Sequence, residues 1–196
     1  ITAIGVSIVL QNLAMLIWGR NYHAFPPILP TDQFDILGAT ITGVQVAIVL
    51  IAALLMAVLI ALIDHTRLGR AMRATAENHK VASLMGVDTN KIIAVTFIIG
   101  SALAAVASIF YGMSYVYIKP TTGAMPGIKA FVAAVFGGIG SIPGAFLGGI
   151  LLGIIENLSK AYISTQLSDA IVFLVLVVVL IVKPTGLLGK KVNVKV

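Results

Sequence analysis

The stretch LGRAMRATAENHKVASLMGVDTNK, residues 68–91, is a polar interval between two long apolar runs, residues 36–63 and 92–118. The connection that contains it, residues 64–91, holds five of the thirteen basic residues of the chain: Arg67, Arg70, Arg73, Lys80 and Lys91. A charged interval of this kind between two apolar runs is typical of a loop that joins two membrane-spanning helices.

The composition supports a membrane protein. Hydrophobic residues make up 59% of the chain, charged residues make up 10%, and the mean hydropathy is +1.08. Soluble domains average about 25% charged residues. The net charge of +6 would suggest nucleic-acid binding in a soluble protein, but here Lys and Arg flank apolar runs and are better explained as determinants of topology. The absence of Cys excludes a disulfide framework and a thiolate metal site.

Five apolar runs predict the fold class: an all-α, polytopic transmembrane helical bundle in which residues 1–196 form a single transmembrane domain. A span needs about 20 residues to cross about 30 Å of hydrocarbon. The runs are Ile1–Trp18, Ile36–Ile63, Ile92–Ile118, Ile128–Ile155 and Ala170–Val182. The first run begins without a Met or a basic flank, so we expect the chain to begin inside a larger protein with earlier spans.

The distribution of Lys and Arg predicts the orientation. The connection 64–91 and the tail are rich in basic residues, whereas the connection 19–35 holds only Arg20. The tail residues are Lys183, Lys190, Lys191 and Lys195. Both rich segments are therefore predicted to be cytoplasmic. A single crossing by the run 128–155 would leave the tail outside, so one segment must cross twice or not at all.

The fourth run contains a candidate for that segment, VFGGIGSIPGAFLGG, residues 135–149. Glycine and proline weaken a helix, and a break here would divide the run into two half-helices. The residues of the predicted break are Gly137, Gly138, Gly140, Ser141, Pro143 and Gly144. A re-entrant hairpin that enters and leaves on the outer side would satisfy the charges and border a translocation path.

A kinked helix that crosses the membrane once is the alternative for the fourth run. Both versions share a stripe of small residues at every fourth position, which lets helices approach closely: Ser141, Ala145, Gly149 and Gly153.

Two short motifs imitate nucleotide-related sites. GIGSIPG, residues 138–144, resembles a glycine-rich dinucleotide loop, but no strand precedes it and its flanks are apolar. VASLMGVDTNKI, residues 81–92, resembles the turn of a helix-turn-helix, but an apolar run of 27 residues follows. We therefore expect neither dinucleotide nor nucleic-acid binding.

The polar interval is predicted to form one helix between Gly69 and Gly86. Arg70, Arg73 and Glu77 would share a face, with Arg73 and Glu77 spaced for an ion pair. A neighbouring face is small and weakly apolar, and Gly86 is placed to stop the helix. This second face comprises Ala71, Ala74, Asn78, Ala82 and Met85. It suits a groove on another protein. The alternative is a solvated basic loop that only determines topology.

The interval GRAMRATAENHKVASLMGVDTNKI, residues 69–92, also resembles the cytoplasmic coupling segment of permease subunits of ATP-binding-cassette importers of the branched-chain amino acid class. Three further stretches resemble that family in the same order. They are ITAIGVSIVLQN at residues 1–12, PGIKAFVAAVFGGIGSIPGAFLGGILLGIIE at 126–156 and VKPTGLLGKK at 182–191. The resemblance covers essentially the whole chain, which is similar to about the last two-thirds of these longer permeases.

The resemblance implies a multi-pass permease domain of a prokaryotic cell (inner) membrane that moves branched-chain amino acids. Implied partners are two cytoplasmic ATPase subunits, a second permease subunit, an extracytoplasmic substrate-binding protein, the amino acid itself and membrane lipid. The chain is then no enzyme and needs no cofactor, since ATP and magnesium bind the ATPases; GLLGKK, residues 186–191, lacks the spacing and the Ser or Thr of a phosphate loop. The implied coupling residues are Gly69, Arg70, Ala71, Arg73, Ala74, Glu77, Asn78, Ala82 and Gly86.

Other functions stay open at this point. Importers of urea or short amides are similar in sequence. A secondary transporter driven by an ion gradient would need ionisable residues inside the spans, where this chain has essentially none. A membrane anchor without a transport path is disfavoured by the glycine-rich break. The connections 19–35, with Pro26, Pro27 and Pro30, and 119–127 are predicted to lie outside and to contact the binding protein.

Overall fold

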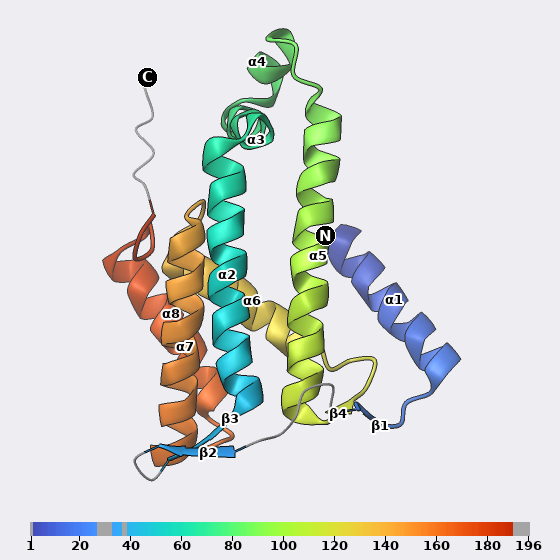
Figure 1. Ribbon diagram of the computed structural model, residues 1–196, viewed down its shortest axis with the longest axis vertical. Helices are drawn as coiled ribbons and strands as arrows, with labels where there is room; N and C mark the ends of the chain where they lie inside the picture. The colour runs from blue at the N-terminus through green and yellow to red at the C-terminus, as the bar shows by residue number, and fades with distance from the viewer. Residues whose placement is uncertain (1, 27–32, 37–38, 190–196) are drawn as a thin grey trace. The chain divides into compact units, whose positions relative to one another are not determined.

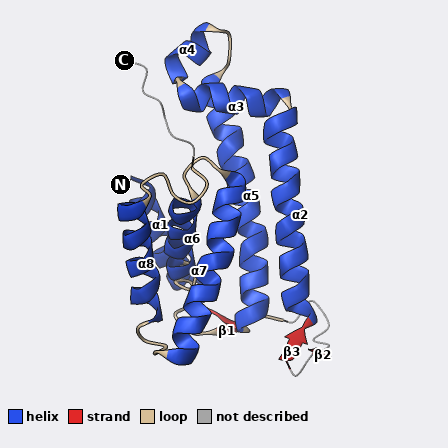
Figure 2. Ribbon diagram, turned by 90° about the vertical axis from the view of Figure 1, so that its left-hand side faces the viewer, coloured by secondary structure: helices blue, strands red, loops and turns tan. Residues whose placement is uncertain are grey.

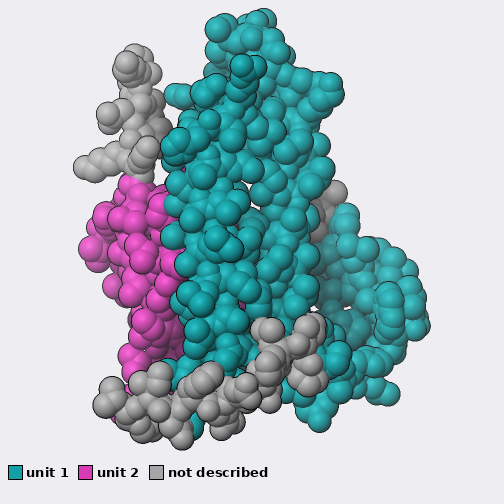
Figure 3. All heavy atoms as spheres, viewed as in Figure 1, with its two compact units in different colours: residues 1–122 teal, residues 123–196 magenta. Residues whose placement is uncertain are grey.

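The computed structural model describes residues 2–26, 33–36 and 39–189. Some residues named above lie outside the described residues: Ile1, Pro27, Pro30, Lys190, Lys191 and Lys195. The chain divides into two compact units, Ile1–Thr122 and Gly123–Val196 (Figure 3). The single domain predicted from the sequence stays a prediction.

The described residues form an all-α protein, as predicted. Three helices are long and apolar enough to cross a membrane: α2 (Gly43–His65), α5 (Thr89–Tyr115) and α7 (Ile142–Tyr162). Three shorter apolar helices accompany them: α1 (Thr2–Trp18), α6 (Ala124–Gly137) and α8 (Ser168–Val182). Strands are confined to two antiparallel pairs of two to four residues each.

The second apolar run is helical over a shorter range than its hydropathy suggests. The strands β2 (Gln33–Ile36) and β3 (Ala39–Thr42) pair antiparallel, and α2 begins only at Gly43. The alternating β-branched residues of ATIT favour a strand over a helix. Gln45 Oε1 accepts a hydrogen bond from the Thr42 amide at 3.2 Å, which defines the helix start.

The third run ends in a similar way. α5 stops at Tyr115 because Val116 has a φ of 57°, a left-handed conformation that ends a helix. The next residues, β4 (Tyr117–Ile118), pair antiparallel with β1 (His23–Ala24). This pairing fixes the segment that follows α1 to the end of α5.

Two short helices, α3 (Arg67–Glu77) and α4 (His79–Leu84), connect α2 to α5. Figures 1 and 2 show α3 lying across one end of α2 and α5, and the short strands lying at the opposite end of these two helices. The polar interval therefore occupies one end of the first unit, as expected for a loop between two antiparallel spans.

The second unit is built on α6, α7 and α8. Its buried core consists of Val132 and Phe136 on α6, Leu152 on α7 and Val172 on α8. α6 and α7 approach closely because glycines meet backbone: a Cβ on Gly148 would overlap the carbonyl oxygen of Ala133.

Candidate functional site

The predicted coupling segment begins with a capped helix. Thr66 Oγ1 accepts a hydrogen bond from the Gly69 amide at 3.1 Å and donates one to the Leu62 carbonyl oxygen. A Cβ on Gly69 would overlap the backbone of Ile63, so α3 rests directly on the end of α2. Gly69 is thus a packing residue of the corner between the two helices.

The prediction of one helix from Gly69 to Gly86 is wrong, because the segment is divided at Asn78. This residue has extended backbone angles (φ −154°, ψ 105°), and it ends α3 and begins α4. Its side-chain oxygen accepts hydrogen bonds from the amides of Lys80 and Val81, both at 3.1 Å. Asparagine is a strong N-cap, and here capping a new helix outcompetes continuing the old one.

The two predicted faces of the segment are only partly accessible. Gly69 and Ala82 are buried, and Ala71 is half-buried. The exposed members of the predicted coupling set are Arg70, Arg73, Ala74, Glu77, Asn78 and Gly86. A partner protein could therefore contact the outer side of α3 but not the glycine or the alanine that hold the corner together.

Arg73 pairs with a different acid from the one predicted. Its guanidinium contacts Asp64 Oδ1 at 2.6 Å, across the corner between α2 and α3. Glu77 has no hydrogen bond or ion pair with any described residue and is exposed. Both partners of the Arg73–Asp64 pair are about half exposed, so the pair adds only about 0–1 kcal/mol to stability. Glu77 consequently keeps its charge free for another molecule.

Three apolar side chains on the segment were not singled out as a group in the sequence. Val81, Leu84 and Met85, on and just after α4, are 53%, 87% and 80% exposed. In a helix as short as α4, the spacing of apolar residues does not show whether their side chains are exposed or buried. The feature of the sequence that could have identified them is the presence of three large apolar residues within an otherwise polar stretch.

The segment ends as predicted at Gly86, whose φ of +84° terminates the turn after α4. Asp88 then caps α5, since its Oδ1 accepts a hydrogen bond from the Lys91 amide at 3.2 Å. A side-chain hydrogen bond from Lys91 lowers the pKa of the Asp88 carboxyl below its ordinary value. Asp88 is therefore ionised at neutral pH, which suits the positive end of the α5 dipole.

The predicted break in the fourth run is present. α6 ends at Gly137. The next two glycines, Gly138 and Gly140, have positive φ values of 115° and 86°. Ser141 then caps α7, because its hydroxyl oxygen accepts a hydrogen bond from the Gly144 amide at 3.1 Å. Pro143 lies in the first turn of α7, where its missing N–H costs nothing.

The chain reverses direction at this break, so the run is a helical hairpin and not one kinked helix. A Cβ on Gly137 would overlap the Gly144 carbonyl, and one on Gly148 would meet Ala133 and Gly137. Contacts in this antiparallel register require α6 and α7 to lie side by side. The alternative of a kinked helix that crosses once is thereby excluded.

The loop that follows α8 covers the end of α6. The amides of Leu187 and Leu188 donate hydrogen bonds to the carbonyls of Phe136 and Gly137, at 3.0 and 2.8 Å. These are the last carbonyls of α6, which have no partner within their own helix. The turn 138–141 therefore lies at the same end of the second unit as the C-terminus of α8.

The two helices of the hairpin differ in length. At 1.5 Å per residue, α6 is about 21 Å long and α7 about 32 Å long, against about 30 Å of hydrocarbon. α6 is therefore shorter than the hydrocarbon layer, and the turn of the hairpin lies beside the loop that follows α8. The role of the break residues in a translocation path stays a prediction.

The small-residue stripe in α7 is displaced by one position from the predicted one. Gly144 and Gly148 face α6, whereas a Cβ on Gly149 or Gly153 would meet no other atom within 4 Å among the described residues. Both sets recur every fourth residue, so spacing alone could not distinguish them.

Two charged residues inside the hairpin contradict the view that the spans are essentially uncharged. Lys129 lies in α6 and Glu156 in α7, and their side chains form an ion pair at 2.8 Å. Pairing of opposite charges is the usual condition for ionisable groups in apolar helices.

The geometry thus defines a membrane protein with several spanning helices, a polar corner at one end and a glycine-broken hairpin. Residues 1–180 match the family model described as branched-chain amino acid transport system / permease component. The chain belongs to this family. No solved structure matches it.

Three relatives describe the family further. The high-affinity branched-chain amino acid transport system permease protein LivH of Escherichia coli K12 is 47% identical, and BraD of Pseudomonas aeruginosa, of the same description, is 46% identical. Each alignment covers 97% of this chain and 63% of the relative. The autoinducer 2 import system permease protein LsrC of Escherichia coli is 33% identical over 78% of this chain and 46% of its own length. The chain therefore spans somewhat less than two-thirds of the length of LivH and BraD.

Proposed function

We propose that the chain is part of the membrane-spanning subunit of an ATP-driven importer of branched-chain amino acids. The observation that carries the proposal is the family match over residues 1–180, together with 47% identity to LivH. ATP hydrolysis then belongs to two separate cytoplasmic subunits, and a second permease subunit completes the path. An extracytoplasmic binding protein delivers the amino acid.

The proposed orientation places residues 64–91 in the cytoplasm, because this connection is the basic one. α5 then crosses outward, α6 inward, α7 outward and α8 inward. In this orientation the two arms of the hairpin would satisfy the parity of the charges, since they would bring the basic tail to the cytoplasmic side. The capping of α6 by the loop after α8 supports this arrangement, because both would lie at the cytoplasmic end.

Coupling to the ATPases is proposed for the outer side of α3 and α4. This surface combines the unpaired charge of Glu77 and the small exposed Ala74 with the exposed apolar side chains of Leu84 and Met85. An apolar tip beside a small face can enter a groove on a partner, while a charge beside it favours one orientation. Its attachment to α2 through Gly69 and Thr66 would transmit a displacement of the segment to that spanning helix.

The experiment that tests coupling replaces Ala74 by Trp in the full-length subunit, co-reconstituted with its partner subunits in vesicles. A bulky side chain in a docked face costs about 1–3 kcal/mol, so ATP-dependent leucine uptake should fall about fivefold or more. Ala76→Trp is the matched control, because Ala76 is exposed on another side of the same helix.

Reversal of charge provides the second arm. Glu77→Lys should also lower uptake, whereas Glu77→Gln should lower it less, because reversal adds repulsion to the loss of attraction. The subunit should remain inserted and assembled in every variant. Normal uptake in both Ala74→Trp and Glu77→Lys would show that the segment only determines topology.

A further inference from the structure

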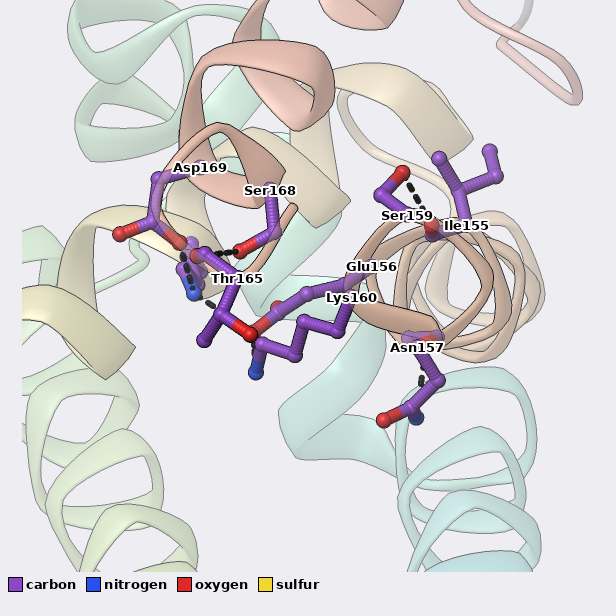
Figure 4. Close-up of polar contacts among 10 residues, drawn as sticks. Ile155, Glu156, Asn157, Ser159, Lys160, Thr165, Ser168 and Asp169 are labelled. Atoms are coloured by element: carbon purple, nitrogen blue, oxygen red, sulfur yellow. Dashed lines mark hydrogen bonds and ion pairs between the residues drawn. The ribbon is translucent and has the colours of Figure 1, made fainter. Parts of the chain in front are cut away.

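Four charged side chains form a continuous chain of ion pairs across the three helices of the second unit. Asp169 Oδ1 contacts Lys129 Nζ at 2.6 Å, Lys129 Nζ contacts Glu156 Oε1 at 2.8 Å, and Lys160 Nζ contacts the same oxygen at 2.5 Å. Lys129 lies on α6, Glu156 and Lys160 on α7, and Asp169 on α8. Figure 4 shows the side chains of Glu156, Lys160 and Asp169 converging on one region.

The order of charges along this chain is negative, positive, negative, positive. The two middle groups, Lys129 and Glu156, each have two partners and are 24% and 18% exposed. Among the described residues, the end groups, Asp169 and Lys160, each have one ion-pair partner, and they are 39% and 34% exposed. The chain therefore presents one incompletely paired carboxylate and one incompletely paired ammonium to a molecule from outside.

The end groups are held on ordered supports. Glu156 and Lys160 are four residues apart on α7, so their pair lies along one helix face. Asp169 lies in the first turn of α8, where a carboxylate is favoured by the helix dipole. Ser168 Oγ donates a hydrogen bond to the Thr165 carbonyl at 2.9 Å and so fixes the chain just before that turn (Figure 4).

The two ends lie within reach of a single α-amino acid. Three contacts of hydrogen-bond length connect Asp169 to Lys160, so the two end groups are at most three such lengths apart. In an α-amino acid the ammonium and the carboxylate are joined through one carbon, at about one hydrogen-bond length from each other. One hydrogen bond at each end then spans the distance.

We propose that this chain of charges is an acceptance site for a zwitterionic amino acid, with Asp169 binding the α-ammonium and Lys160 the α-carboxylate. The zwitterion would close the linear chain into a ring of alternating charges. The site rests on the proposed function for its ligand and on the proposed orientation for its place at the outer ends of α6, α7 and α8. There it would receive an amino acid from the extracytoplasmic side.

Affinity and selectivity follow from the same surroundings. The end groups are more than one-third exposed, so solvent weakens their interactions and binding is weak enough for release. The connection that joins the helix of Lys160 to the helix of Asp169 carries two exposed apolar residues, Ile163 at 65% and Leu167 at 54%. The charges recognise the backbone of an amino acid, and these residues favour an apolar side chain.

The test uses protection from alkylation. The printed sequence contains no Cys, so Thr165→Cys supplies a unique thiol in this part of the protein, beside the end groups. The full-length subunit with its partner subunits is reconstituted in vesicles without binding protein or ATP. An impermeant maleimide is added with increasing leucine, and mass spectrometry reads the modification at position 165.

We expect leucine to slow alkylation, and neither 4-methylpentanoate, which lacks the ammonium, nor 3-methylbutylamine, which lacks the carboxylate, to do so at the same concentration. Asp169→Asn and Lys160→Gln should each raise the leucine concentration for half-protection about 10- to 100-fold, because each removes a charge-assisted hydrogen bond. Lys183→Gln is the matched control and should leave protection unchanged, since Lys183 follows the C-terminus of α8, at the end of that helix opposite to Asp169, and contacts the Leu187 carbonyl.

The site is rejected if leucine gives no protection, if the single-charge analogues protect equally, or if both variants keep the wild-type protection. The first two results are measured in the Thr165→Cys protein, in which Asp169 and Lys160 are unchanged. They therefore hold even if the Asp169 and Lys160 variants fail to fold. Leucine uptake is measured in parallel after binding protein and ATP are added to a second portion of the same vesicles. Uptake without protection rejects this site alone, whereas absent uptake contradicts the proposed function.

Discussion

Two adjacent glycines on α7 should respond differently to the same substitution. Gly148 faces α6, where a Cβ would overlap the Ala133 carbonyl and the Gly137 backbone, whereas a Cβ on Gly149 meets open space. Gly148→Ala and Gly149→Ala therefore add the same methyl group to the same helix, one into a contact and one outside it.

The magnitude follows from two opposing effects. Alanine stabilises a helix interior by about 1 kcal/mol relative to glycine, and both variants gain this. Overpacking costs about 1–3 kcal/mol, and only Gly148→Ala incurs it, because the atoms that the new methyl meets are backbone and cannot rotate away. The unfolding free energies of the two variants should therefore differ by about 1–3 kcal/mol. At about 2–4 °C per kcal/mol for a chain of this size, their thermal unfolding midpoints should differ by about 2–12 °C.

The assay is thermal unfolding of each purified subunit in detergent, followed by far-ultraviolet circular dichroism at matched detergent concentration. Gly148→Ala should melt below Gly149→Ala, and Gly149→Ala should melt at or above the unsubstituted protein. Gly153→Ala, which is also open, should behave like Gly149→Ala. Equal midpoints for the adjacent variants would refute the hairpin packing.

The remaining predictions concern the polar segment and the topology. Asn78→Ala should lower the stability of α4 by about 0.5–2 kcal/mol through loss of its cap, and hydrogen exchange of the Val81 amide should accelerate accordingly. Arg73→Met should change the unfolding free energy by no more than about 1 kcal/mol in a thermal or denaturant titration, because its pair with Asp64 is half exposed. Single cysteines at Thr122 and Ser164 should react with an impermeant thiol reagent in intact cells, whereas one at Ile139, in the turn, should react only after permeabilisation; the reverse pattern would invert the proposed orientation.

Much of the fold follows from composition. Hydropathy alone locates the spanning helices, because a run of more than 20 apolar residues has few alternatives in a membrane. The glycine-rich stretch also located the break, since Gly138 and Gly140 need the positive φ values that glycine adopts without strain. The charge parity of the chain predicted that one segment must cross twice or not at all.

Contacts between distant segments could not be predicted. The pair of Lys129 with Glu156 joins residues 27 positions apart and depends on the register of the hairpin. The choice of Gly148 over Gly149 as the packed residue depends on the same register, and both glycines satisfy the spacing rule.

The polar segment shows a competition between local signals. Its residues favour a helix on both sides of Asn78, and nothing in the spacing shows whether that side chain faces solvent or caps the following turn. The pairing of Arg73 with Asp64 likewise depends on the corner made at Thr66, which places residues nine positions apart in contact. Local propensity favours helices here, but the position of the corner decides which charges meet.

The central claim is tested most directly by the energy source and the substrate of transport. The full-length subunit is reconstituted in vesicles with its second permease subunit, its ATPases and its binding protein, and initial uptake of labelled leucine is measured with and without ATP. The account predicts that leucine uptake requires both ATP and the binding protein. Unlabelled isoleucine or valine should reduce this uptake by competition, and urea should leave it unchanged. Leucine uptake driven by an ion gradient without ATP would contradict the claim, and ATP-driven uptake of urea but not of leucine would contradict the substrate.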